Sequence, residues 1–165
     1  MYQPTILVLR QKHQVVIACD HHILTHYSKD QIIAADCHFT NIDNSTQPLV
    51  NEILRQDLSI HASCLTLAQQ LHNRCDSYHE IMLASINHTF LICSDGNLVS
   101  NSESVWASGP NSDYVTLIAK ALFCTHQKSL ENIASQALIQ TASLQQKRSG
   151  TTQIKTIRPE DVKAL

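Results

Sequence analysis

Two continuous apolar runs dominate the start of the chain, one over residues 6–9 and one over residues 15–19. Neither run alternates between apolar and polar residues, and this is the pattern of a strand that is covered on both faces. The polar segment over residues 11–14 separates the runs and is short enough to be the loop of a hairpin. We therefore expect the first two strands to lie centrally in a sheet.

A second hairpin is predicted over residues 89–100. An apolar run there meets Leu98 and Val99 across Asp95-Gly96-Asn97. Asp-Gly between apolar runs is a strong hairpin signal, because glycine adopts the positive φ that a tight turn needs. The small residues at 108–110 then break the chain before a helix.

Four segments repeat apolar residues at the i, i+3, i+4, i+7 spacing of a helix that buries one face. The first is expected to begin near Pro48, the second at Ser59 and the last at Ser129, where polar residues can cap a helix. The expected buried stripes are Leu49, Val50, Ile53, Leu54 and Leu58; Cys64, Leu67, Ala68, Leu71 and Cys75; Tyr114, Leu117, Ile118, Ala121 and Leu122; and Leu130, Ile133, Ala134, Ala137, Leu138 and Thr141. We expect each stripe to face a sheet.

Two further strands are predicted. Residues 31–35 form a short apolar run, and residues 151–157 alternate as a half-buried or edge strand does, before Pro159 ends it. No repeat, linker or low-complexity tract divides the chain, so we expect one domain over residues 1–165. Strands, helices, strands, helices and a final strand predict a layered α+β fold.

Composition narrows the classes of function. The chain has 165 residues, of which 43% are hydrophobic and 16% charged, with a net charge of −2. This charge offers no electrostatic footprint for nucleic acid, and no apolar run approaches the roughly 20 residues that cross a bilayer. The first five residues lack the basic and apolar regions of a secretory signal. We expect a cytoplasmic protein that binds neither nucleic acid nor membrane.

Cysteine and histidine raise the question of a metal site. The six cysteines are scattered singly and mostly lie in apolar runs, so we expect reduced core thiols rather than disulfides. His21, His22 and His26 lie close together, but the nearest further ligands, Cys37 and His38, are neighbours that point to opposite faces of a strand. We expect loop histidines, no metal and no cofactor.

The order of these segments resembles the proteasome β-subunit family, and within it the bacterial HslV peptidase. The likeness covers nearly the whole chain. The segments that carry it are residues 5–10, 15–20, 89–99, 106–109, 119–122 and 129–138. The resemblance implies the four-layer αββα sandwich of antiparallel sheets of the N-terminal-nucleophile (Ntn) hydrolases, and it implies a homo-oligomer of the ring type.

In that family the nucleophile is an N-terminal threonine freed by processing, and its own α-amino group is the base. An aspartate, a lysine and a glycine-rich turn complete the site. Asp20 matches the aspartate, and Ser108 and Gly109 match a Ser-Gly turn. Counted back from Asp20, the nucleophile position falls on Pro4, which has no hydroxyl. Thr5 matches the second threonine of the family's paired start, and a one-residue slip that made it the nucleophile would reverse every side chain of the strand.

The lysine and the oxyanion turn are also altered. In the ungapped register the lysine position falls on Asp36, a carboxylate of the wrong sign. In the alternative register the hairpin over residues 20–30 is shortened, and the strand that bears the lysine is largely missing. Cys37 and His38 stand where the family has glycines, and bulky residues disfavour the positive φ and the close approach of a substrate strand. We therefore expect a vestigial site at Pro4, Asp36, Cys37 and His38.

The leading hypothesis is a catalytically inactive, self-assembling homologue of the threonine-type endopeptidases. A second hypothesis is an active threonine peptidase in protein catabolism that uses Thr5 after N-terminal processing, together with Asp20, Ser108 and Gly109. A third is a regulatory or structural subunit that binds an HslV-like ring or an ATPase partner.

Overall fold

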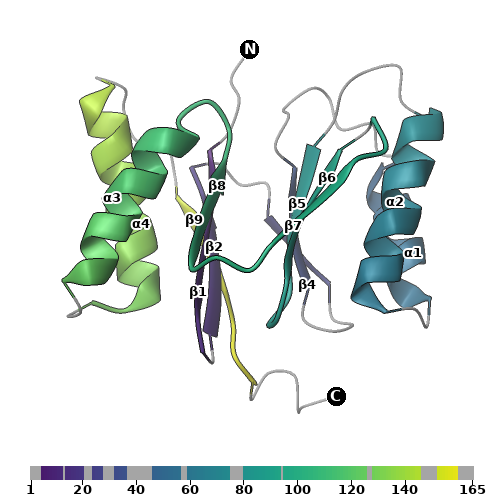
Figure 1. Ribbon diagram of the computed structural model, residues 1–165, viewed down its shortest axis with the longest axis horizontal. Helices are drawn as coiled ribbons and strands as arrows, with labels where there is room; N and C mark the ends of the chain where they lie inside the picture. The colour runs from purple at the N-terminus through teal and green to yellow at the C-terminus, as the bar shows by residue number, and fades with distance from the viewer. Residues whose placement is uncertain are drawn as a thin grey trace.

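Two antiparallel sheets lie face to face in the computed structural model, and a pair of helices covers the outer face of each (Figure 1). The described residues are 5–12, 14–20, 24–27, 32–36, 46–56, 59–74, 80–93, 95–125, 128–145 and 152–159. Helices α1 and α2 form one outer layer, next to the sheet that contains β3 to β7. The sheet that contains β1 and β2 follows, and helices α3 and α4 form the other outer layer. The expected four-layer αββα sandwich is confirmed.

One sheet has the strand order β8-β1-β2-β9. Its central pair, β1 and β2, is the first predicted hairpin, and its edge strand β9 is the predicted C-terminal strand. The bounds are β1 Ile6–Gln11, β2 Gln14–Cys19, β8 Val105–Ser108 and β9 Gln153–Ile157. The continuous apolar runs are therefore central strands covered on both faces.

The other sheet has the order β3-β4-β5-β6-β7. Its β6–β7 hairpin turns at Gly96, whose φ of +92° confirms the predicted glycine turn. The bounds are β3 Leu24–Tyr27, β4 Ile32–Asp36, β5 Glu80–Ala84, β6 Thr89–Cys93 and β7 Leu98–Asn101.

The helices are α1 Thr46–Arg55, α2 Ile60–Arg74, α3 Ser112–Cys124 and α4 Leu130–Leu144. Ser129 caps α4 as predicted, because its side chain accepts a hydrogen bond from the Asn132 backbone N–H. Ser59 does the same for the backbone N–H of Ala62 at the start of α2. Across the described helices, none combines the length and apolarity that crossing a membrane requires.

Three layers of apolar side chains join the four layers of backbone. One lies between α1/α2 and the β3–β7 sheet and includes Leu67 and Leu83. The middle one, with Ile6, Ile17 and Met82, lies between the two sheets, and the third, with Leu7, lies under α3 and α4. Because side chains alternate along a strand, each residue of β1 and β2 can be assigned to the inter-sheet face or to the helix face.

Three sequence expectations need correction. The buried face of α3 is centred on Val115 and Ala119, so Tyr114, Leu117 and Ala121 of the predicted stripe are exposed. His26 lies in β3 and pairs with Ile33 rather than lying in a loop. The alternative register leaves the strand that bears the lysine largely missing. A short strand, β3, is nevertheless present before β4, and it contains no lysine.

The four cysteines among the described residues divide into two groups. Cys19, Cys64 and Cys93 are buried reduced thiols, as expected, whereas Cys124 is exposed at the end of α3. Burial raises the pKa of the Cys64 thiol to about 12, because the apolar core disfavours the thiolate. The apolar packing of Cys64 between α2 and the sheet thus holds it in the protonated form.

We expect the stability of the fold to fall at alkaline pH in a way that depends on Cys64. Above the unfolded pKa of about 8.5 the unfolded chain releases a proton that the folded chain keeps up to about pH 12, so the free energy of unfolding falls as pH rises. Between pH 8 and 10.5 the parent should lose roughly 2 kcal/mol more than the Cys64→Ala variant, measured by urea unfolding at each pH. Parallel pH profiles for the two proteins would refute this.

Candidate functional site

The ends of the neighbouring strands β8, β1 and β2 lie side by side at one end of their sheet, the Thr5 edge. Ile6 pairs with Cys19 on one side and with Ser108 on the other. The next position of each strand brings Thr5, Asp20 and Gly109 together at this edge. The sequence-predicted residues Thr5, Asp20, Ser108 and Gly109 are thus neighbours, although the chain separates them by up to about a hundred positions.

Thr5 and Asp20 are joined by two hydrogen bonds. The Thr5 backbone N–H donates to Asp20 Oδ1 over 3.0 Å, and the Asp20 backbone N–H donates to the Thr5 carbonyl over 3.4 Å. The Cys19 thiol lies 3.9 Å from the same Oδ1 atom. The carboxylate is therefore engaged with the main chain at the start of β1.

The Thr5 side chain belongs to the helix face of the sheet. Ile6 and Val8 contribute to the core between the sheets, whereas Leu7 and Leu9 pack under α3 and α4. By alternation Thr5 shares the face of Leu7 and Leu9. Its side chain is 1% exposed, and within the described part of the chain its Oγ1 atom has no hydrogen-bond partner.

Ser108 lies on the opposite face. It pairs with Ile6, so its side chain shares the inter-sheet face, and it is partly exposed. Gly109 follows with a φ of +108°, a conformation that costs an L-residue strain, and its carbonyl accepts from the Ser112 N–H as α3 begins. The Ser-Gly turn is present, but its hydroxyl and that of Thr5 project from opposite faces of the sheet.

Of the predicted vestigial residues, Pro4, Cys37 and His38 lie outside the described residues. Asp36 ends β4 and pairs with Ile81. Of the position that the ungapped register gives to the lysine, the structure thus shows the place in the β4–β5 ladder.

Lys155 is a cation that sequence reasoning did not select. It lies in β9 and pairs with Ile17, whose side chain packs between the sheets, so Lys155 is on the inter-sheet face. Two intervals between strands separate β9 from β1, a distance of about 10 Å. Lys155 is thus remote from Thr5 and on the other face. Only the pairing of β9 with β2 shows which face Lys155 occupies, so the sequence offers no signal for it.

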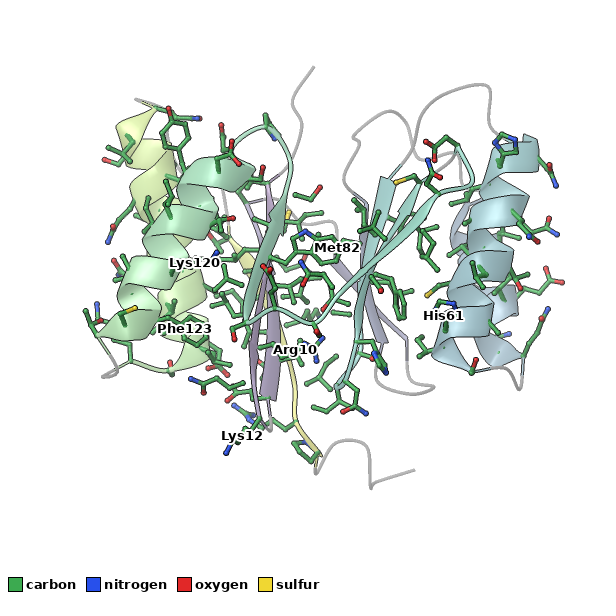
Figure 2. All side chains as sticks on the ribbon, viewed as in Figure 1. Arg10, Lys12, His61, Met82, Lys120 and Phe123 are labelled. Carbon is green, nitrogen blue, oxygen red and sulfur yellow. The ribbon has the colours of Figure 1, made fainter. Side chains whose placement is uncertain are left out.

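Arg10 forms a polar link between the two sheets at the opposite end of β1. Its guanidinium donates to the Ser85 carbonyl over 3.1 Å, to Thr89 Oγ1 over 2.7 Å and to the Ile86 carbonyl. Burial lowers the pKa of Arg10, because desolvation disfavours its charge. Figure 2 shows Arg10 and Met82 reaching into the space between the sheets.

A groove of about 530 Å³ lies apart from this edge. It is formed by the β7–β8 connection and the second half of α3, with Glu103, Val105, Lys120 and Phe123 among its lining residues (Figure 2). Val105 begins β8, whereas Ser108 at the Thr5 edge ends it. The groove is therefore not part of the Thr5 site.

The layer order and the strand order define a sandwich of the Ntn-hydrolase type. No family model and no curated protein matches the sequence. Among solved structures, HslV from Trypanosoma brucei matches with a TM-score of 0.76 and 15% identity over 93% of this chain and 99% of that chain.

Two structures of BPH from Thiobacillus denitrificans also match. The complex with epoxomicin has a TM-score of 0.67 and 14% identity over 93% of this chain and 98% of that chain. The structure described as BPH alone has a TM-score of 0.64 and 14% identity over 93% of this chain and 97% of that chain. The chain has the fold of HslV, as the sequence resemblance predicted.

Proposed function

We propose that this chain is an HslV-type scaffold that lacks threonine peptidase chemistry and works as a self-assembling protein. The orientation of Thr5 carries the proposal. A threonine nucleophile needs a hydroxyl that substrate can reach, and this hydroxyl is buried on the helix face. Pairing on both sides holds β1 in that register, so a slip of one residue would break two ladders at once.

The nitrogen of Thr5 is equally unsuited to catalysis. In the intact chain it is an amide whose proton is donated to Asp20. If trimming exposed it, the new amine would lie 3.0 Å from a carboxylate, which favours the protonated amine over the free base. Lys155 lies two strands away from Thr5 and on the other face of the sheet, so it cannot take the part of the family's lysine.

The proposal is tested on the purified full chain. Intact mass gives the first residue, a panel of fluorogenic peptide amides gives hydrolysis, and thermal shift gives binding of epoxomicin, the ligand in the T. denitrificans complex. We expect an untrimmed chain, no turnover above a buffer blank and no thermal shift. A chain that begins at Thr5 and hydrolyses a peptide would overturn the proposal.

Thr5→Val should stabilise the protein rather than inactivate it. Valine has the shape of threonine without the hydroxyl, and the Thr5 hydroxyl is buried without a hydrogen bond. Removing that desolvated group should raise the free energy of unfolding by about 1 kcal/mol. Urea unfolding measures the change, and Thr66→Val on α2, whose hydroxyl donates to the Ala62 carbonyl, is the matched control that should gain nothing. A loss of stability in Thr5→Val would mean that the hydroxyl has a partner.

The competing function is an active threonine peptidase, and one observation favours it. A buried hydroxyl without a partner beside a bound carboxylate is unusual in a purely structural position. This reading requires Thr5→Val and Asp20→Asn to abolish a measurable peptidase activity. Equal hydrolysis by the parent and the two variants would exclude a threonine peptidase that uses Thr5.

The assembly that we propose is a homo-oligomer, and apolar side chains exposed on the helices support it. Sedimentation velocity of the parent should show a concentration-dependent species larger than 18.5 kDa. Mixing the chain with an HslV-like ring or its ATPase tests the regulatory alternative, for which co-sedimentation would be required.

A further inference from the structure

The groove between the β7–β8 connection and α3, which we call the α3 groove, has the size and the lining of a small-ligand site. Its volume of about 530 Å³ lies within the roughly 300–1,000 Å³ of such sites. Val105 and Phe123 belong to the edge of the core beneath α3 and α4, and they supply the apolar part of the lining. The other lining residues are Ser102, Glu103, Ser104, Lys120 and Cys124.

Both walls of the α3 groove are held in place by the fold. On the β7–β8 side, the Glu103 backbone N–H donates to Asn101 Oδ1 over 2.7 Å, and the Arg10 backbone N–H donates to the Ser104 carbonyl over 2.8 Å. The other wall is the second half of α3, a helix that packs against β8 and α4. Because the walls are fixed before a ligand arrives, binding does not have to order them.

Two opposite charges lie on the two walls. Glu103 is exposed on the β7–β8 connection, and Lys120 is exposed on α3. Within the part of the chain that the structure describes, no ion pair joins these two groups or uses either of them. A ligand with one positive and one negative end can therefore pair with both walls.

The direction of α3 determines which end of such a ligand meets which wall. After the turn at Gly109 the chain runs back along β8, so the connection before Val105 lies toward the C-terminal end of α3 (Figure 1). This end of a helix carries a partial negative charge, and the last turn of α3 contains no basic residue. Together with Glu103 it favours an ammonium group, whereas Lys120, one turn earlier, favours a carboxylate.

We propose that the α3 groove binds a small apolar zwitterion, which is an α-amino acid or a short peptide with free ends and an apolar side chain. The ammonium group pairs with Glu103, the carboxylate pairs with Lys120, and the side chain lies on Val105 and Phe123. A ligand with a single charge satisfies one wall and leaves the other unpaired. The site is separate from the Thr5 edge, and it requires neither peptidase chemistry nor assembly.

Alkylation of Cys124 measures occupancy of the groove, because this exposed thiol is part of the lining, whereas Cys19, Cys64 and Cys93 are buried. The full chain is treated with iodoacetamide at increasing concentrations of leucine or leucyl-leucine, and peptide mapping gives the rate at Cys124. We expect the rate to fall with a half-maximal effect at about 1 mM, since a ligand with few atoms binds weakly. Protection by leucine identifies an amino-acid site, and protection by the dipeptide alone identifies a site for peptides.

Derivatives of the protecting ligand test each charge separately. The N-acetylated form lacks the ammonium group and the C-terminal amide lacks the carboxylate, so each should bind about 5-fold more weakly than the free ligand. In Glu103→Gln the acetylated form should bind as well as the free ligand, and in Lys120→Gln the amide should do so, because the pair is already lost. Asp113→Asn and Lys128→Gln are the matched controls, which remove exposed charges outside the groove and should change nothing.

The proposal is overturned if neither leucine nor leucyl-leucine protects Cys124 at roughly 10 mM, or if the doubly blocked N-acetyl-leucinamide protects equally well. A Cys124 that resists alkylation without ligand would overturn it too, because the groove would then be covered. Circular dichroism melts should show that the variants fold. Leucine has no peptide bond to hydrolyse, so its result is independent of the test of Thr5 chemistry.

Discussion

Replacing Arg10 by methionine is expected to lower the free energy of unfolding by about 3 kcal/mol. The guanidinium donates to the Ser85 and Ile86 carbonyls and to Thr89 Oγ1, and Ser85 and Thr89 are buried. Methionine keeps the apolar stem of the side chain and removes all the donors. The oxygens are then left without their charged partner, and this desolvation cost exceeds what is regained by no longer burying a charge.

Urea unfolding of Arg10→Met measures this cost, and Arg158→Met is its control. Arg158 is exposed and bonded to Glu131 over 3.0 Å, and an exposed ion pair contributes about 1 kcal/mol or less. Arg10→Lys should fall between parent and Arg10→Met, because one ammonium group cannot reproduce the fork of a guanidinium. If Arg10→Met and Arg158→Met cost the same, Arg10 does not hold the two sheets together.

The second large effect is expected at Leu67. This side chain is 1% exposed in the core between α2 and the β3–β7 sheet, so Leu67→Ala should cost about 3 kcal/mol through lost burial and the cavity left behind. Leu65, two positions earlier on the same helix, is 41% exposed. Leu65→Ala should therefore cost less than about 1 kcal/mol.

The same denaturation measurement compares the two leucine variants, which differ in burial and not in chemistry. Helix propensity is equal for the two substitutions, so the difference of about 2 kcal/mol reports the face that α2 buries. Similar losses for both variants would mean that α2 turns a different face to the sheet. This pair therefore checks how α2 packs on the β3–β7 sheet.

Helices α4 and α3 show how far periodicity alone predicts packing. For α4 the expected stripe from Leu130 to Thr141 is the buried one, because the other positions are mostly polar. In α3 apolar residues occur on every side, so the spacing of Tyr114 and Leu117 fits one buried face as well as the spacing of Val115 and Ala119 fits another. Contact with β8 and α4 selects the second face, and sequence spacing carries no information about that contact.

The strands show the same division. The first hairpin and the Gly96 turn follow from short-range pattern and backbone preference, and both were predicted. Strand β5, over Glu80–Ala84, lies in the middle of its sheet and was not predicted, because its apolar run of four residues after a helix has no turn signal of its own. Its pairing with β4 and β6 supplies the hydrogen bonds that make it a strand.

The site could be located from the sequence but not oriented. Its members were named because Asp20 and the Ser108-Gly109 turn follow strands at the family's spacing, and the structure brings them to Thr5. The reversal that a one-residue offset causes was predicted from the two-residue period of a strand. Only coordinates show which residues of β1 face the other sheet, because Ile6 and Leu7 are equally apolar.

The amino-acid sequence by itself determined the order of most strands and helices and the glycine turns, because each depends on local backbone preference. Only the tertiary structure decided which faces are buried: Thr5 turned toward the helices, Arg10 bonded between the sheets, and Leu117 left at the surface. These outcomes depend on contacts between residues far apart in the chain, and a pattern that is apolar on every side does not specify them.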